Sequence, residues 1–184
     1  AAKLCALGPQ DRVSHHTPLH FDMSIFDIFS TVSAGACITI IPEAHTKFPA
    51  SLAALVASER ITVWYSVPFA LAQLVSQGNL SKHDLSALRT VMFAGEAMPP
   101  HVISEVAGFL PNAEFINAYG PTETNHCTSA RFSAADLDGQ SALPIGTPEN
   151  GVTALVDGDG ELLIASDQVM HGYWADDARS AAAF

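Results

Sequence analysis

The sequence predicts an α/β fold in which a parallel sheet is flanked by helices and is followed by part of a β-rich subdomain. Hydrophobic residues make up 48% of the 184-residue chain, enough for a sizeable core. Short apolar runs alternate with segments of helical periodicity, a pattern typical of parallel sheets covered by helices. From about Cys127 onward the helical periods disappear. We therefore predict an α/β subdomain at 1–130 and a partial β-rich subdomain at 131–184.

The first subdomain should alternate strands with helices. Strands are predicted at 13–21, 36–41, 62–67, 90–93 and 113–116. Helices are predicted at 25–32, 49–60, 69–75 and 99–110. Gly35 is placed to end the first helix, and Pro49 lies in the first turn of the second. Because helices connect most of these strands, we expect the strands to run parallel.

The second subdomain should consist mainly of strands. Residues 152–156 and 161–164 read as two strands on either side of the turn 157–160, which has the sequence DGDG. The last residues, 180–184, have the composition of a helix. We therefore expect a hairpin followed by the start of a helix.

Charge and composition exclude several classes of partner. The formal net charge is −11 with only 8 Lys and Arg residues, which argues against nucleic acid and anionic membranes. No apolar run approaches the roughly 20 residues of a membrane span. The 3 cysteines are far apart and suit a reducing compartment, so we expect a cytoplasmic protein.

A dense group of functional side chains follows the strand predicted at 113–116, in the string NAYGPTE at 117–123. Gly120 and Pro121 predict a turn. Thr122 and Glu123 bring a hydroxyl and a carboxylate beside backbone N–H groups, which suits phosphate oxygens and a hard cation such as Mg²⁺. Asn117 offers an amide to a purine edge, and Tyr119 a flat face to a ring. From the residues alone, a turn with a capping hydroxyl remains the simpler interpretation.

The string NAYGPTE resembles the core signature of adenylate-forming enzymes, in particular the adenylation domains of nonribosomal peptide synthesis and stand-alone amino acid–carrier protein ligases. Two further segments support this resemblance: the string FDMS at 21–24 is similar to the family's substrate motif, and AGE at 94–96 to the segment that lies against adenine. The segments 144–148, 160–164 and 172–174 resemble later motifs, to which we assign a structural role.

The resemblance implies that an amino acid is activated as aminoacyl-AMP with ATP and Mg²⁺, and is then transferred to the phosphopantetheine thiol of a peptidyl carrier protein. Thr122 and Glu123 are implied to be catalytic, with Glu123 as the Mg²⁺ ligand. The implied substrate pocket consists of Asp22, Met23, Phe26, Tyr65, Met92, Ala94, Ala118, His126 and Cys127. The implied nucleotide-binding residues are Gly95, Glu96, Ala97, Asn117, Tyr119, Gly120 and Thr122.

Within this implied pocket, Asp22 would hold the ammonium group of an amino acid, because a buried carboxylate needs a charged partner. Four of its residues are bulky, so the remaining volume should suit a compact neutral side chain; these are Met23, Phe26, Tyr65 and Met92. The strings FDMSIFDIF and TVWYSVP are most similar to stand-alone ligases that load proline or a similar amino acid onto a carrier protein. His126 departs from the apolar residue expected at its position and would favour a polar substrate.

The resemblance covers only a middle portion of an adenylation domain. The phosphate loop, the aspartate that holds the ribose and the C-terminal lid with its catalytic lysine have no counterpart in these residues. We therefore expect the isolated chain to be inactive. Two alternatives stay open: part of an acyl- or aryl-CoA ligase, against which Asp22 argues, and a non-catalytic binding segment.

Two other groupings suggest chemistry but lack the required partners. His15, His16 and His20 could indicate a metal site, yet no cysteine or carboxylate in the sequence pattern completes a tetrahedral set. His126 precedes Cys127 directly, and neighbours on a strand point to opposite faces, which argues against a catalytic pair.

Overall fold

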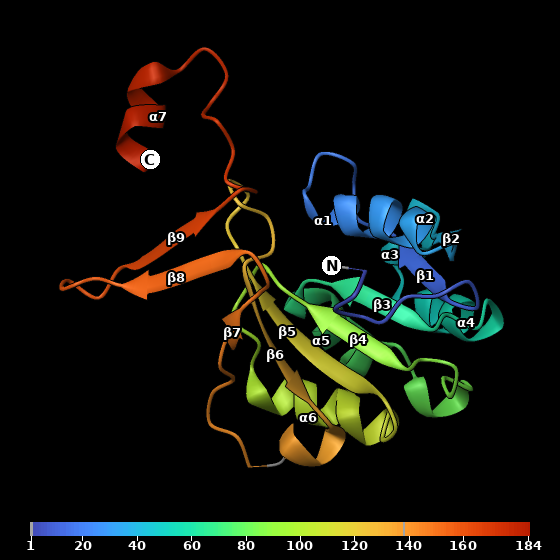
Figure 1. Ribbon diagram of the computed structural model, residues 1–184. Helices are drawn as coiled ribbons and strands as arrows, with labels where there is room; N and C mark the ends of the chain where they lie inside the picture. The colour runs from blue at the N-terminus through green and yellow to red at the C-terminus, as the bar shows by residue number, and fades with distance from the viewer. Residues whose placement is uncertain (1, 138) are drawn as a thin grey trace.

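The computed structural model describes residues 2–137 and 139–184, and within these seven strands form one sheet in the order β2-β1-β3-β4-β5-β6-β7 (Figure 1). The strands are β1 (Arg12–His15), β2 (Cys37–Ile40), β3 (Val63–Ser66), β4 (Thr90–Phe93), β5 (Glu114–Tyr119), β6 (Thr128–Phe132) and β7 (Thr147–Pro148). The first five pair in parallel, whereas β6 and β7 are antiparallel. The predicted α/β class with a mostly parallel sheet is confirmed.

Helices connect the parallel strands. The helical segments are α1 (Met23–Ile25), η1 (Phe26–Ser30), α2 (Thr31–Ser33), α3 (Glu43–Thr46), α4 (Pro49–Ser58), α5 (Pro68–Gln77), η2 (Leu80–Lys82), α6 (Pro100–Phe109), η3 (Ala134–Leu137) and α7 (Asp177–Ala183). The segments α1, η1 and α2 follow one another without a break, and η1 has π-helical geometry. Among the described residues, no helix combines the length and apolar character needed to cross a bilayer.

The two faces of the sheet bury two different cores. Helices α4, α5 and α6 pack on one face, against large side chains such as Trp64, Phe93 and Phe115. The other face buries Tyr65 and Met92 beneath Phe26 and the N-terminal residues. The side chains of β3 and β4 point alternately to both faces and are all buried, as expected for central strands of a parallel sheet.

A separate two-stranded antiparallel sheet, β8 (Val152–Val156) and β9 (Leu162–Ser166), follows β7. Together with α7 it extends away from the large sheet (orange to red in Figure 1). The predicted hairpin and terminal helix are therefore present. Strands β6 and β7 nevertheless belong to the large sheet, and the division at residue 130 remains a prediction.

Three of the expected elements differ from the structure. The strand predicted at 13–21 ends at His15, because the chain turns at Pro18, whose carbonyl accepts from the N–H of Phe21 at 2.9 Å. Strand β5 continues to Tyr119, so the first three residues of NAYGPTE are strand and not turn. The helix at 25–32 is present, but of its apolar residues Ile25, Phe29 and Val32 are exposed.

Asp11 joins three neighbouring strands at their amino-terminal ends. It directly precedes β1, while Thr62 and Arg89 directly precede β3 and β4. Arg89 donates from Nε to Asp11 Oδ1 at 2.9 Å and from Nη2 to Oδ2 at 2.8 Å. The Thr62 hydroxyl donates to Oδ1 at 2.7 Å, and the Gly8 N–H donates to Oδ2 at 2.9 Å. Burial alone would raise the pKa of Asp11, but these bonds outweigh it and lower the pKa to about 2.

We predict that Asp11→Asn destabilises the fold by about 2 kcal/mol at neutral pH, because the folded state binds this carboxylate's proton more weakly than the unfolded chain does. The contribution is fully present above the ordinary pKa of about 4, and it is lost as the pH falls toward 2. Urea unfolding at pH 7 and pH 3 measures both effects. Asp159→Asn, at an exposed turn, is the control. Equal stability of the two variants at pH 7 would contradict the prediction.

Candidate active site

Two adjoining cavities lie at the carboxyl ends of β3, β4 and β5, the edge where open α/β sheets bind ligands. The larger has a volume of about 780 Å³ and the smaller about 420 Å³. The residues that line both are Gly95, Glu96, Ala118, Tyr119, Gly120 and Pro121. The ends of β4 and β5 therefore form a common wall, and ligands in the two cavities would meet along it.

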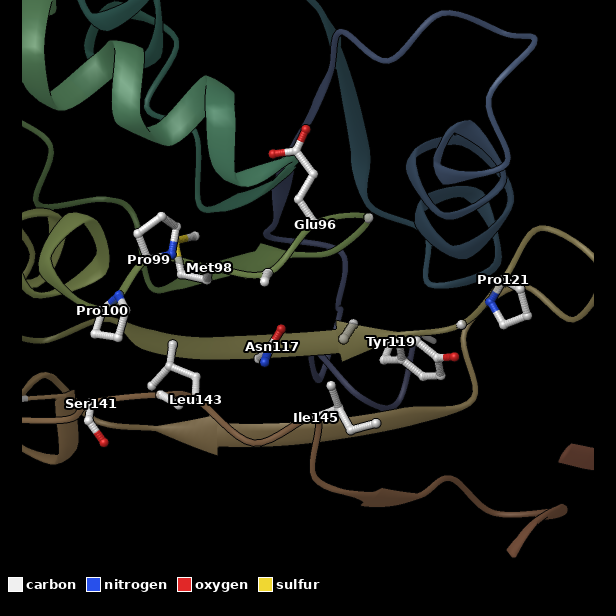
Figure 2. A pocket seen from close by; sticks show the side chains of 15 residues that line it. Glu96, Met98, Pro99, Pro100, Asn117, Tyr119, Pro121, Ser141, Leu143 and Ile145 are labelled. Atoms are coloured by element: carbon white, nitrogen blue, oxygen red, sulfur yellow. The ribbon is translucent and has the colours of Figure 1, made fainter. Parts of the chain in front are cut away.

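The larger cavity is a largely apolar slot beside β5 (Figure 2). Asn117 and Tyr119 line it from the strand, and Leu143 and Ile145 line it from the segment that leads to β7. The Asn117 side-chain amide donates to the carbonyl of Pro144 at 2.8 Å, which holds this segment against β5. The cavity lies between the strand and this segment and reaches the main chain at Gly95, whose φ is +90°.

The smaller cavity brings Asp22, Met23, Tyr65 and His126 together from three parts of the chain. Asp22 occupies the N-cap position of α1, but its side chain makes no capping hydrogen bond. Its carbonyl oxygen accepts instead from the Asn125 side chain at 3.3 Å, which ties the start of α1 to the loop after β5. The carboxylate is thus positioned by the fold without serving the helix, and it is free to bind a ligand.

The loop between β5 and β6 closes on itself at Gly120. The N–H of Cys127 donates to the carbonyl of Tyr119 at 2.8 Å, and the hydroxyl of Thr124 lies 2.8 Å from the Cys127 sulfur. A Cβ atom on Gly120 would lie 1.6 Å from the carbonyl oxygen of Asn125. No residue other than glycine therefore fits at position 120 without moving the loop.

The charged side chains that line the two cavities, among the described residues, are all acidic. Among the described residues that line the two cavities there is no lysine or arginine, whereas Asp22 and Glu96 are acidic. Burial lowers the pKa of His126, although Glu149 acts in the opposite direction, so the imidazole is neutral at pH 7. Burial, with the nearby negative charge of Asp22, raises the pKa of Tyr65 and keeps its phenol neutral. The smaller cavity therefore favours a cationic group.

The two residues predicted to be catalytic lie on the loop between β5 and β6. Thr122 is exposed and lines the smaller cavity. Glu123 lines neither cavity, and its carboxylate accepts a hydrogen bond from the Tyr173 phenol. This bond lowers the pKa of Glu123, so the carboxylate is ionised at neutral pH. A hydroxyl and an ionised carboxylate on adjacent residues are hard oxygen donors of the kind that Mg²⁺ prefers.

A family model described as "AMP-binding enzyme" matches residues 1–174. The chain belongs to the AMP-binding enzyme family. This membership agrees with the predicted resemblance, and it assigns the two adjoining cavities to a fold that is shared with nonribosomal peptide synthetase adenylation domains and amino acid–carrier protein ligases.

Three relatives of this AMP-binding chain illustrate the similarity. L-proline–[L-prolyl-carrier protein] ligases of Streptomyces coelicolor and Pseudomonas fluorescens are 38% and 33% identical, over 91% and 93% of the chain. The adenylation domain AlmE of Vibrio cholerae, solved with glycyl-adenosine-5′-phosphate, is 30% identical over 98% of the chain with a TM-score of 0.83. The chain spans 34%, 36% and 36% of these three proteins, about a third of their length.

The structure of this AMP-binding chain brings most of the predicted substrate residues together. Asp22, Met23, Tyr65, Ala94, Ala118 and His126 line the smaller cavity. Phe26, Met92 and Cys127 are buried and do not line it. Phe26 packs edge-on against Tyr65 with ring centroids 5.2 Å apart, and Met92 belongs to the same core. These two residues therefore support the pocket wall from behind.

The predicted nucleotide residues gather around the larger cavity, with the exception of Thr122 at the smaller one. Sequence reasoning missed the opposite wall, formed by Ser141, Ala142, Leu143 and Ile145. Part of the signal was present in the segment PIGTP at 144–148, to which only a structural role was assigned. It also missed the contact between Tyr173 and Glu123, which are 50 residues apart.

We predict that Gly120→Ala destabilises the AMP-binding fold by more than about 3 kcal/mol, because the new methyl group collides with backbone that cannot rotate away. Gly108→Ala is the matched control: among the described residues, apart from its own helix backbone and chain neighbours, nothing lies within 4 Å of the added Cβ, and alanine favours the helix by up to about 1 kcal/mol. Thermal and urea unfolding compare the variants. Equal stability of both variants would show that the loop does not close at Gly120.

Proposed function

We propose that the protein that contains this chain activates a compact amino acid as aminoacyl-AMP, with ATP and Mg²⁺, and transfers it to the phosphopantetheine thiol of a peptidyl carrier protein. The observation that carries the proposal is the Asp22 carboxylate, which caps no helix and faces a cavity that adjoins a ring-sized slot. The Asp22 carboxylate would recognise an ammonium ion and the slot a nucleobase, and the two cavities share a common wall.

In the smaller cavity, Asp22 would accept hydrogen bonds from the ammonium group of the substrate. The absence of lysine and arginine among the described lining residues leaves this carboxylate without an internal partner. A fatty or aryl acid carries no cation to take that place, so binding it would leave a partly buried charge unpaired. This argues for an amino acid over the substrates of acyl- or aryl-CoA ligases.

In the larger cavity, the adenine ring would lie between the main chain at Gly95 and the segment with Leu143 and Ile145. The α-phosphate would then reach the common wall, where the amino acid arrives from the other side. An oxygen of the amino acid's carboxylate bonds to the α-phosphorus as the bond from that phosphorus to pyrophosphate breaks. Holding both reactants at fixed distance supplies much of the rate enhancement in such transfers.

The described cavity walls contain no lysine or arginine, so other groups would have to balance the negative charge of the phosphates. Bound Mg²⁺ would neutralise charge on the phosphate oxygens. Thr122 and Glu123 are the residues proposed to hold it, through a hydroxyl and an ionised carboxylate. Backbone N–H groups in the loop after β5 can donate to the remaining phosphate oxygens.

Proline is the proposed substrate within this class. The cavity of about 420 Å³ is narrowed by Met23 and Tyr65, and this suits a small ring or a short side chain. The relatives named L-proline–[L-prolyl-carrier protein] ligase support this choice. His126 is the polar group that would distinguish a hydroxylated or otherwise polar analogue from proline itself. That the isolated chain is inactive also stays a prediction.

We predict that the full-length protein catalyses ATP–pyrophosphate exchange with a compact amino acid, and that Asp22→Asn lowers kcat/KM for that amino acid by about 100-fold or more. The expected 100-fold loss in kcat/KM follows from removing one partner of a desolvated charge pair. A panel of amino acids that includes proline, glycine and alanine identifies the substrate. Asp159→Asn, on an exposed turn, should leave exchange unchanged. Exchange with fatty or aryl acids that survives Asp22→Asn would contradict the proposal and favour the CoA-ligase alternative.

A further inference from the structure

Glu123 is held from the far end of the chain. The Tyr173 phenol donates a hydrogen bond to Oε1 of Glu123, and the N–H of Met170 donates to the Glu123 carbonyl at 2.8 Å. The segment after β9 therefore fixes both the main chain and the side chain of this residue. Without these bonds a glutamate on this loop would be free to sample many rotamers.

Tyr173 is itself fixed by the start of α7. Its N–H donates to the hydroxyl of Ser180 at 2.9 Å, and the Arg179 guanidinium lies 4.3 Å from the centroid of its ring. Gly172, with a φ of +147°, brings the chain so close that an added Cβ would lie 2.9 Å from the Ser180 hydroxyl. The phenol is thus presented to Glu123 by several independent contacts.

We propose that Tyr173 is a positioning residue for the cation site: its phenol holds one oxygen of the Glu123 carboxylate so that the other points toward the nucleotide-bound Mg²⁺. The inference rests on the proposed function and extends it to a residue outside the two cavities. A phenol has one proton to donate and so engages one carboxylate oxygen, which leaves the second available to a cation. Hydrogen bonds from such outer partners orient metal ligands and typically change metal affinity by about 10- to 100-fold.

The test is Tyr173→Phe in the full-length protein, which removes the hydroxyl and keeps the ring beneath Arg179. The first measurement is the affinity of Mn²⁺, as a paramagnetic substitute for Mg²⁺, for the enzyme with a non-hydrolysable ATP analogue, by electron paramagnetic resonance. We expect it to weaken about tenfold or more. The second is the Mg²⁺ dependence of exchange: the half-saturating concentration should rise, while kcat at saturating Mg²⁺ stays near that of the wild type.

The matched control is Trp174→Phe, an aromatic substitution at the next residue, whose side chain is 98% exposed. It should change neither measurement. Glu123→Gln provides a second background, in which adding Tyr173→Phe should have no further effect on Mn²⁺ affinity. An unchanged Mn²⁺ affinity in Tyr173→Phe, or an equal loss in both backgrounds, would overturn the role of Tyr173.

Failure of the proposed function has a different signature. If the wild type exchanges pyrophosphate with no amino acid of the panel, the activity assigned to the protein is wrong. The Mn²⁺ measurement needs no amino acid and still decides whether Tyr173 positions Glu123 at a nucleotide-bound cation. Equal thermal stability of Tyr173→Phe and Trp174→Phe would show that the effect on Mn²⁺ is local.

Discussion

The close approach of the Gly120 backbone to the Asn125 carbonyl is the constraint on which the site depends. It turns the chain back within a few residues of the end of β5, so that β6 can pair with β5 in antiparallel register. The same turn aims three groups in three directions: Tyr119 toward the slot, Asn125 toward the start of α1, and Glu123 toward the segment after β9. A larger residue at position 120 would displace all three together.

Neither cavity has a basic residue among its described walls, so negative charge has different consequences for the two ligands of the proposed function. A cavity that contains Asp22 and has no basic residue among its described walls attracts an ammonium group and repels a bare carboxylate or phosphate. The proposed function nevertheless requires that the carboxylate of an amino acid approach a triphosphate. Under that proposal, Asp22 would neutralise the ammonium group and a bound cation would neutralise the phosphates, so the two binding events would depend on different residues.

Sequence reasoning recovered the elements whose signal is local. Buried strands such as β4 appear as short apolar runs, and α4 and α6 have prolines at their starts, so these elements were found within a few residues. The strand predicted at 13–21 failed because Pro18 creates a turn within a run of mixed residues. Asp22, which motif resemblance assigned to the substrate pocket, lines the smaller cavity, and its role there stays a prediction. Motif resemblance could not separate lining residues from supporting ones such as Met92, because that distinction depends on strand register and burial. Tyr173 contacts Glu123 across 50 residues of sequence, and the wall at 141–145 lies far in sequence from the β5 residues it faces. Hydrophobic periodicity cannot predict contacts between such distant segments.

The arrangement of the cavity walls also bears on how such a protein can change during evolution or in the laboratory. Met23, Tyr65 and His126 line the smaller cavity and not the larger one. Under the proposed function, substitutions there would alter which side chain is accepted while the slot for the ring keeps its shape. Tyr119, Gly120 and Pro121 line both cavities, so a change among them would affect both proposed ligands at once. Libraries intended to redirect selectivity should therefore vary the first group and leave the second untouched.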